Sequence, residues 1–257
     1  MDSSWIGPAS GQARVIKCGW TARLCGALAL ILLPWAAQAE HLSEYLYTVL
    51  RGGEAIGTHR VTVSPDGLDL KIEAETELEV SFGPLTFYRL EHLRQEVWRN
   101  GELEEMTAYT NKNGDVYDIA ITRDSQGYKR VINGRTDRFE SSMKLLTLWH
   151  DDLFRYSSFV SPMEDKTYQI SVDFVTADKI DLIDRSVDAV AYRMSGDTNR
   201  ELWYDAEGHI MKVRLLDHSV AIEYVLNSMS EVTTKLAEAG GATPGHHGPV
   251  TRLAARR

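Results

Sequence analysis

The sequence predicts a mainly β domain, in which an antiparallel meander closes into a barrel or a strongly curved half-barrel with a short covering helix. Three observations carry this prediction. The dominant hydrophobic period is two, turn motifs recur at hairpin spacing, and a single stretch changes to helical spacing. Long strands in a meander leave exposed edges unless the sheet curls, and a barrel or deeply curved sheet is the usual result.

The clearest period-two segment runs from Leu68 to Val80. Every even position in it can be buried, and every odd position carries Asp, Lys or Glu. A helix would scatter these charges around its circumference, whereas a strand places them all on one face. The segment therefore indicates a long strand with one core face and one acidic face in water, which is typical of antiparallel sheets.

Turn motifs separate the segments of strand character. They are Pro65-Asp66-Gly67, Asn100-Gly101, Asn113-Gly114, Ser125-Gln126-Gly127, Asn133-Gly134 and Asp205-Ala206-Glu207-Gly208. Between them we predict strands at about 43–50, 56–64, 68–80, 85–99, 102–110, 115–123, 127–133, 166–175, 187–195, 199–205, 208–216 and 219–228. Because mostly short turns join these segments, the strands are expected to follow one another as a meander.

Residues 141–156, with the sequence SSMKLLTLWHDDLFRY, differ from the rest of the chain. Their apolar residues fit helical spacing, and Ser141 or Ser142 is suited to cap the start of a helix. We expect a helix of two to three turns followed by a loop. Such an element either covers one open end of the barrel or packs as an ordinary crossover in the core.

Residues 1–39 have the features of a cleaved export signal. Three basic residues precede an uncharged run at 24–37, and Ala37-Gln38-Ala39 matches the A-x-A cleavage pattern. An uncleaved membrane anchor is the weaker alternative, because Pro34 interrupts a run shorter than the ~20 residues needed to span a bilayer. We expect cleavage after Ala39, a periplasmic or secreted domain at 40–235, a disordered tail at 236–257 and no transmembrane segment after cleavage.

Both cysteines, Cys18 and Cys25, lie in this leader. A domain that begins at Glu40 therefore has no disulfide, no cysteine nucleophile and no Cys-based metal site. Removal of the leader also leaves 25 basic and 36 acidic residues, a net charge near −11. A chain this acidic repels phosphate backbones, so nucleic acid is not an expected partner.

The strand at 85–99 is unusual because neither of its faces is cleanly apolar. One face must point inward, and a buried ionic group needs a partner. Two interpretations remain open, namely a polar patch inside a ligand cavity and an internal ion-pair network that sets the strand register. With a histidine from the strand at 56–64 added, the ligand-cavity candidates are Tyr88, His92, Arg94, Glu96, Trp98 and His59.

Local signatures of catalysis and metal binding are missing from the sequence. It contains no G-x-S-x-G, Walker, dinucleotide-binding or H-E-x-x-H motif, so we assign no catalytic residue and expect no cofactor. His59 and His92 lie on strands that a meander places two apart, and with Glu96 they would suit zinc if they converged. Because neither H-x-H nor H-x-x-x-H spacing occurs, we predict no metal site.

Several motifs together resemble a known family. They are Tyr47-x3-Arg51-x4-Ile56-Gly57-x-His59-Arg60-Val61, Tyr88-Arg89-x2-His92-x3-Glu96-x-Trp98-Arg99-Asn100-Gly101, Ser195-Gly196-Asp197, Leu202-Trp203-Tyr204-Asp205-x2-Gly208 and Ile222-Glu223-Tyr224. Over about 45–228 the chain is similar to secreted bacterial proteins known only as a domain of unknown function. The resemblance implies an exported β-rich domain and no established activity. The expected shape is also similar, by analogy alone, to periplasmic lipoprotein carriers.

These observations favour a periplasmic protein that binds an apolar or amphipathic, lipid-like small molecule without catalysis. One alternative is a structural or assembly factor of the cell envelope whose core is filled. A third is a dispersed-site hydrolase or metal-binding protein that uses His59, His92 and Glu96. An interior cavity above roughly 300 Å³ favours a ligand site, whereas a core packed to normal density favours the structural role.

Overall fold

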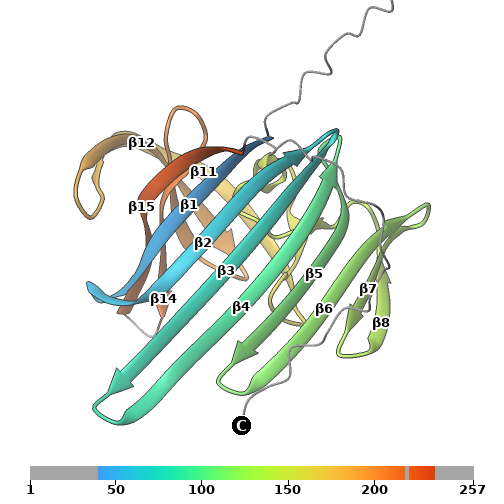
Figure 1. The fold of residues 1–257 in the computed structure, drawn as a ribbon, viewed down its shortest axis with the longest axis horizontal. Helices are drawn as coiled ribbons and strands as arrows, with labels where there is room; N and C mark the ends of the chain where they lie inside the picture. Colours follow the sequence, from blue (N-terminus) through green and yellow to red (C-terminus); the bar gives the residue numbers. More distant parts are fainter. Residues whose placement is uncertain (1–39, 218–219, 235–257) are drawn as a thin grey trace, which may run out of the picture. The chain divides into compact units, whose positions relative to one another are not determined.

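The structure, a computed structural model, describes residues 40–217 and 220–234 (Figure 1). The predicted signal peptide at 1–39 and the predicted tail at 236–257 lie outside the described residues. Within the described part, one sheet contains fifteen strands in the order β8-β7-β6-β5-β4-β3-β2-β1-β15-β14-β13-β12-β11-β10-β9. All neighbours are antiparallel except β9 and β10, which are parallel. The predicted antiparallel meander is therefore confirmed.

The turns that the sequence predicted join six pairs of consecutive strands. Their bounds are β1 (Glu40–Arg51), β2 (Glu54–Asp66), β3 (Asp69–Phe82), β4 (Leu85–Arg99), β5 (Glu102–Lys112), β6 (Asp115–Asp124), β7 (Gly127–Ile132), β8 (Arg135–Phe139), β9 (Lys144–Leu145), β10 (Ser158–Val160), β11 (Thr167–Asp181), β12 (Ser186–Gly196), β13 (Arg200–Tyr204), β14 (Ile210–Asp217) and β15 (Val220–Thr234). Each predicted strand corresponds to one of these. The sequence did not predict β8, β9 and β10, because strands this short and irregular show no clear alternation.

The predicted helix at 141–156 is wrong. Lys144–Leu145 forms β9, and the only helical turn described in this stretch is a 3-10 turn, η1, at Asp151–Phe154. The backbone N–H of Leu146 donates to the carbonyl of Val160 at 2.9 Å, so this stretch bonds to β10 and not to itself. Pairing with a distant strand has overridden a local helical spacing, which is a weak preference on its own.

The two ends of the sheet meet by packing and ion pairs. The edge strands β8 and β9 are not hydrogen-bonded to each other among the described strands. Instead, Leu145 of β9 and Val160 of β10 are buried in a core cluster together with side chains from β3 to β7. Lys144 of β9 also pairs with Glu102 of β5 at 3.1 Å. The last strands therefore lie against the inward face of the first half of the sheet.

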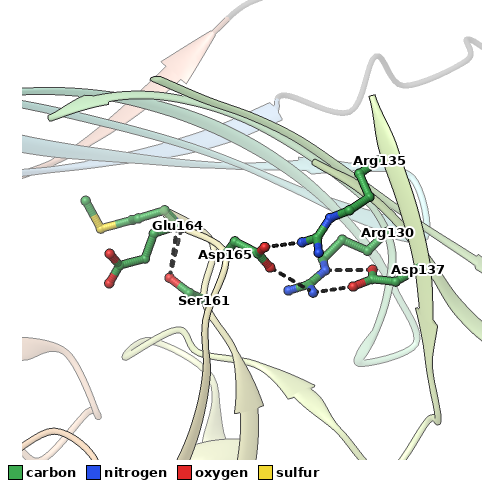
Figure 2. A network of polar contacts seen from close by, with 7 residues as sticks. Arg130, Arg135, Asp137, Ser161, Glu164 and Asp165 are labelled. Carbon is green, nitrogen blue, oxygen red and sulfur yellow. Dashed lines mark hydrogen bonds and ion pairs between the residues drawn. The ribbon is translucent and has the colours of Figure 1, made fainter. Parts of the chain in front are cut away.

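Asp165, in the loop between β10 and β11, forms the second link across this junction. Figure 2 shows its carboxylate reaching Arg130 of β7 and Arg135 of β8, while Asp137 holds Arg130 from the other side. The Arg130 side chain is only 7% exposed, so its charge is matched by these carboxylates and not by water. We call Arg130, Arg135, Asp137 and Asp165 the clasp.

The two largest clusters of buried side chains join different parts of the sheet. The first joins β3–β7 with β9 and β10 and includes Ile72, Met106, Ile119 and Ile121. The second joins β10–β14 with the region of η1 and includes Leu153, Phe159, Met194 and Leu202. In Figure 1 the long strands β1 to β6 form a curved wall, with the yellow segment that carries η1 behind it.

Candidate ligand-binding cavity

A cavity of about 430 Å³ lies on the inward face of the sheet. Because strand side chains alternate, it is the alternate residues of each strand that reach it, for example Tyr88, Leu90, His92 and Arg94 of β4. The remaining lining residues are Tyr45, Tyr47, His59, Val61, Val63, Thr76, Thr110, Lys112, Tyr117, Leu146, Thr147, Leu148, Trp149, Ser161, Pro162, Met163, Glu164, Tyr168, Arg200, Gly208, His209, Ile210, Val213, Leu215 and Tyr224. Most of them are aromatic or aliphatic.

One polar row crosses the cavity wall at right angles to the strands. The register places its members opposite one another on β1 to β6, in the order Tyr47, His59, Thr76, His92, Thr110 and Tyr117. Neighbouring side chains of this kind lie close enough to bond across antiparallel strands. The row is a consequence of register, which places residues from Tyr47 to Tyr117 of the sequence in one line across six strands.

The two histidines of this row are each bonded to a threonine. His59 Nδ1 lies 2.8 Å from Thr76 Oγ1, and His92 Nδ1 lies 2.8 Å from Thr110 Oγ1. Burial, reinforced by the positive charge of Arg94, lowers the pKa of His59 to about 4 and the pKa of His92 to about 3. Both imidazoles are therefore neutral near pH 7 and act as hydrogen-bonding groups of the wall.

Arg94 marks the border between the cavity and the core beneath it. Its Nε lies 2.6 Å from Oε1 of Glu96. The other oxygen of Glu96 accepts a hydrogen bond of 2.6 Å from the indole Nε1 of Trp98. Trp98 in turn stacks on His150 with ring centroids 4.5 Å apart. The contact between Arg94 and Glu96 is an ion pair without hydrogen-bond geometry, because Arg94 Nε and Glu96 Oε1 have no hydrogen-bond partner among the described residues.

The structure separates the six predicted cavity residues into two groups. Tyr88, His92, Arg94 and His59 line the cavity. Glu96 and Trp98 lie on the same face of β4 but further along it, where they are buried behind the wall. A cavity wall and an internal ion pair therefore occur on one face of β4.

Residues 146–149, which precede η1, and 161–164, which follow β10, also line the cavity. Ser161 Oγ accepts from the backbone N–H groups of Met163 and Glu164, at 3.1 and 3.2 Å, and so shapes the turn that the clasp holds in place (Figure 2). Tyr168 donates its hydroxyl to Glu164 at 2.8 Å. These contacts fix the position of a loop that lines the cavity.

Several buried polar atoms on the wall have no hydrogen-bond partner among the described residues. They are His92 Nε2, Arg94 Nε, Thr147 Oγ1, Trp149 Nε1 and Arg200 Nε. A buried donor or acceptor without a partner costs about 1–3 kcal/mol. Their concentration around one cavity indicates a space suited to a molecule that carries a few polar groups on an apolar body.

The charges of the wall are mainly positive. Arg94, Lys112 and Arg200 line the cavity, whereas Glu164 is the single carboxylate among the described lining residues. Lys112 is exposed and Arg94 is already paired with Glu96. This local positive charge contrasts with the acidic composition of the domain as a whole.

Sequence reasoning missed several lining residues, of which Arg200 is the most informative. It occupies the same face of β13 as the buried Leu202 and Tyr204, so alternation alone would have placed a charge on an inward face. Thr147 and Trp149 were assigned to the helix that is not formed. Tyr168 and Tyr224 lie in segments that were predicted as strands but not as parts of a cavity wall.

The proposed metal combination of His59, His92 and Glu96 is not assembled. Within the described chain, the groups of three potential ligands that come within 4.8 Å of one another are His150, Asp151 and Asp152, and Asp205, Glu207 and His209. Asp205 Oδ1 accepts from the backbone N–H of Glu207 and of His209. That carboxylate therefore stabilises the turn between β13 and β14.

The outer face of the sheet has a larger hollow of about 520 Å³. Side chains there are already paired across strands, with Arg60 bonded to Glu75 at 3.0 Å and Gln95 bonded to Glu73 at 3.1 Å. Tyr109 is the single aromatic residue among its described lining residues, whereas the inner cavity has many. The inner cavity is therefore the stronger candidate for a ligand site.

No helix in the described ranges has the length and apolar character needed to cross a membrane. No match to this chain is found among the curated proteins.

A similar fold occurs in a solved structure, the beta-barrel-like protein of domain of unknown function DUF1849 from Brucella abortus. It aligns with a TM-score of 0.51 and 8% identity over 76% of this chain and 98% of that chain. At this identity the likeness concerns the fold alone. The sequence also matches a family over residues 47–227, most of the described domain, which confirms the predicted resemblance to a β-rich family. The chain therefore belongs to the family described as domain of unknown function DUF6134.

Proposed function

We propose that this domain binds an apolar or amphipathic, lipid-like small molecule in its inner cavity, without catalysing a reaction. The observation that carries the proposal is the cavity of about 430 Å³ with a mostly aromatic and aliphatic wall. Small-molecule sites in proteins have volumes of about 300–1,000 Å³ and similar linings. A structural protein with a filled core has no need of such a space.

The chemistry of the wall agrees with a mixed ligand. Val61, Leu90, Val213 and Leu215 offer apolar surface, and burial of an apolar ligand on such surface is favourable by about 25 cal/mol per Å². The neutral imidazoles of the polar row add hydrogen-bonding groups at fixed positions. Export to the periplasm, which the leader at 1–39 predicts, is part of the same proposal.

The first experiment measures binding of an uncharged fluorescent dye, 1-N-phenylnaphthylamine, to protein purified after expression of the full chain. Val63→Trp places a large ring on the inward face of β2, and we expect it to weaken dye binding about tenfold or more. Thr62→Trp places the same ring on the opposite face, beside the outer hollow, and serves as the matched control. Thermal unfolding of both variants shows that each is folded.

Two outcomes would contradict the proposal. One is the absence of saturable dye binding to the wild-type protein. The other is that Thr62→Trp, and not Val63→Trp, abolishes binding, because the outer hollow would then hold the dye. Native mass spectrometry of protein from its own host is the second test, with a co-purifying lipid as the expected result. A bare polypeptide mass together with no dye binding favours the structural role.

A further inference from the structure

Among the charged groups of the cavity wall that are not exposed, the Arg200 guanidinium is the one that forms no ion pair with a described residue. It lies at the start of β13, opposite Leu215 of β14, and lines the cavity. No carboxylate in the described chain forms an ion pair with it, and its Nε has no hydrogen-bond partner despite being buried. Its polar neighbours are the phenols of Tyr168 and Tyr224.

The other two cations of the wall differ from Arg200. Arg94 is neutralised by Glu96 at 2.6 Å. Lys112 is exposed, so its ammonium is solvated by water. Glu164, the single lining carboxylate, is bonded to Tyr168 and Lys166. The charge of Arg200 is therefore the one available to a molecule that enters the cavity.

The Arg200 side chain is partly buried, and a partly buried cation without a counter-ion is costly to the folded protein, since proteins normally pair buried charges. The planar guanidinium also presents donors that match the two oxygens of a carboxylate or a phosphate. A ligand that brings an oxyanion to Arg200 removes this cost and satisfies its free donor. An apolar body attached to that oxyanion would lie along the aliphatic and aromatic wall.

We propose that the ligand of the cavity is an amphipathic anion, in which a carboxylate or phosphate head binds Arg200 and the apolar body occupies the rest of the space. This inference rests on the proposed function, because it specifies the chemistry of the molecule that the same cavity binds. It assigns Arg200 as the specificity-determining residue for the charged head.

The test compares cis-parinaric acid with its methyl ester at pH 8, using the intrinsic fluorescence of both probes. We expect the wild-type protein to bind the acid at least about tenfold more tightly than the ester. Arg200→Gln is expected to reduce this preference to less than about twofold while the ester binds unchanged. Arg200→Lys keeps the charge but loses the planar guanidinium. Its preference for the acid over the ester is expected to lie between those of the wild type and Arg200→Gln.

Arg193→Gln is the matched control, because it removes the same charge from an exposed position on the adjacent strand β12. It should leave both affinities unchanged. Thermal unfolding supplies a second readout, since Arg200→Gln removes an unmatched charge and is expected to leave the melting temperature equal to or higher than that of the wild type. A clear fall in melting temperature, with an unchanged acid preference, would show a structural role and overturn the inference.

The outcomes separate this inference from the proposed function. If acid and ester bind equally well, the cavity binds apolar molecules and the role of Arg200 is refuted. If neither probe binds, nor the uncharged dye, the proposed function fails and this inference fails with it. If the acid preference depends on Arg200, displacement by palmitate or by lysophosphatidic acid, with monoacylglycerol as the neutral control, identifies the head as carboxylate or phosphate.

Discussion

Arg94 Nε lies 2.6 Å from Oε1 of Glu96, two residues further along the same inward face of β4. The two side chains are 11% and 0% exposed, so the pair is buried. Arg94 lines the cavity and Glu96 lies behind it, bonded also to Trp98. The pair therefore neutralises the wall at the place where the polar row meets the apolar core.

Glu96→Gln is expected to destabilise the protein strongly. The substitution leaves the Arg94 charge buried without its partner, a change that costs about 3–5 kcal/mol in comparable buried pairs. Glu91→Gln is the matched control, because Arg89 and Glu91 form the same spacing on the outer face of β4 with exposed fractions of 60% and 37%. An exposed pair contributes about 0–1 kcal/mol. Urea unfolding measures the stability of both variants. Equal losses of stability would contradict the view that the Arg94–Glu96 pair is buried.

Stability is expected to fall as the pH falls from about 6.5 toward 4. The pKa of His59 is lowered to about 4 and the pKa of His92 to about 3, whereas both titrate near 6.5 in the unfolded chain. In this window the unfolded chain binds protons that the folded chain does not, so the free energy of unfolding decreases. The stabilisation that the folded chain gains by keeping the two histidines neutral is fully present above pH 6.5. It is lost as the pH falls through the folded-state pKa values.

His92→Asn tests this pH dependence, because asparagine keeps a polar atom for Thr110 but does not titrate. Between pH 7 and pH 5 we expect the variant to lose about 2 kcal/mol less stability than the wild type. Urea midpoints at the two pH values provide the measurement. If the two proteins lose the same stability between pH 7 and pH 5, His92 is not held neutral by the fold.

Asp165→Asn is expected to loosen the junction between the two ends of the sheet. Arg130 keeps Asp137, so the global loss should be modest, at about 1 kcal/mol. Local opening should increase more, and hydrogen exchange should accelerate in residues 158–166 and 127–139. Asp124→Asn is the control, since its partner Arg138 lies in an exposed pair on the same edge of the sheet. Equal exchange in the two variants would refute the role of the clasp.

Gly57→Ala is expected to be among the most disruptive small substitutions in the sheet. A Cβ at Gly57 would lie 1.9 Å from the carbonyl oxygen of Glu77, so a backbone segment must shift. We expect a loss above about 3 kcal/mol, together with a disturbed position of His59 two residues later. Gly67→Ala meets open space in its turn and is expected to cost only about 1–2 kcal/mol, from its positive φ of 63°. Thermal unfolding distinguishes these values.

The exported protein is expected to begin at Glu40. Intact-mass analysis of protein recovered from the periplasm of a Gram-negative host measures this directly. A mass that corresponds to residues 40–257, with no reaction toward a thiol reagent, is the expected result because both cysteines precede the cut. A retained leader, or a mass including Cys18 or Cys25, would contradict the prediction.

Much of the sheet could be predicted from local sequence. The alternation in residues 68–80 determined both the strand β3 and its wet face, because the period of two is a property of the extended backbone. The turns at Asn100-Gly101, Asn113-Gly114 and Asn133-Gly134 could also be predicted, because the backbone of a tight hairpin turn selects these residue types. Each of these asparagines adopts a positive φ, which few other residues tolerate.

The segment at 141–166 could not be predicted in this way. Its apolar spacing suits a helix, but Leu145 and Val160 are buried together against strands β3 to β7, which lie distant in sequence. The energy of that packing exceeds a local helical preference of a few tenths of a kcal/mol per residue. The same reason explains why Thr147 and Trp149 were not recognised as part of a cavity wall.

The sequence by itself determined the long strands, six of their turns and which residues of a strand share a face, since all three follow from short-range backbone geometry. Only the tertiary structure decided which inward faces meet around the cavity, and that Arg94 has a carboxylate beside it while Arg200 does not. Alternation states that a residue points inward, but the curvature of the sheet decides what it faces there. The curvature of the sheet therefore decides whether an inward residue belongs to a filled core or to the wall of a cavity.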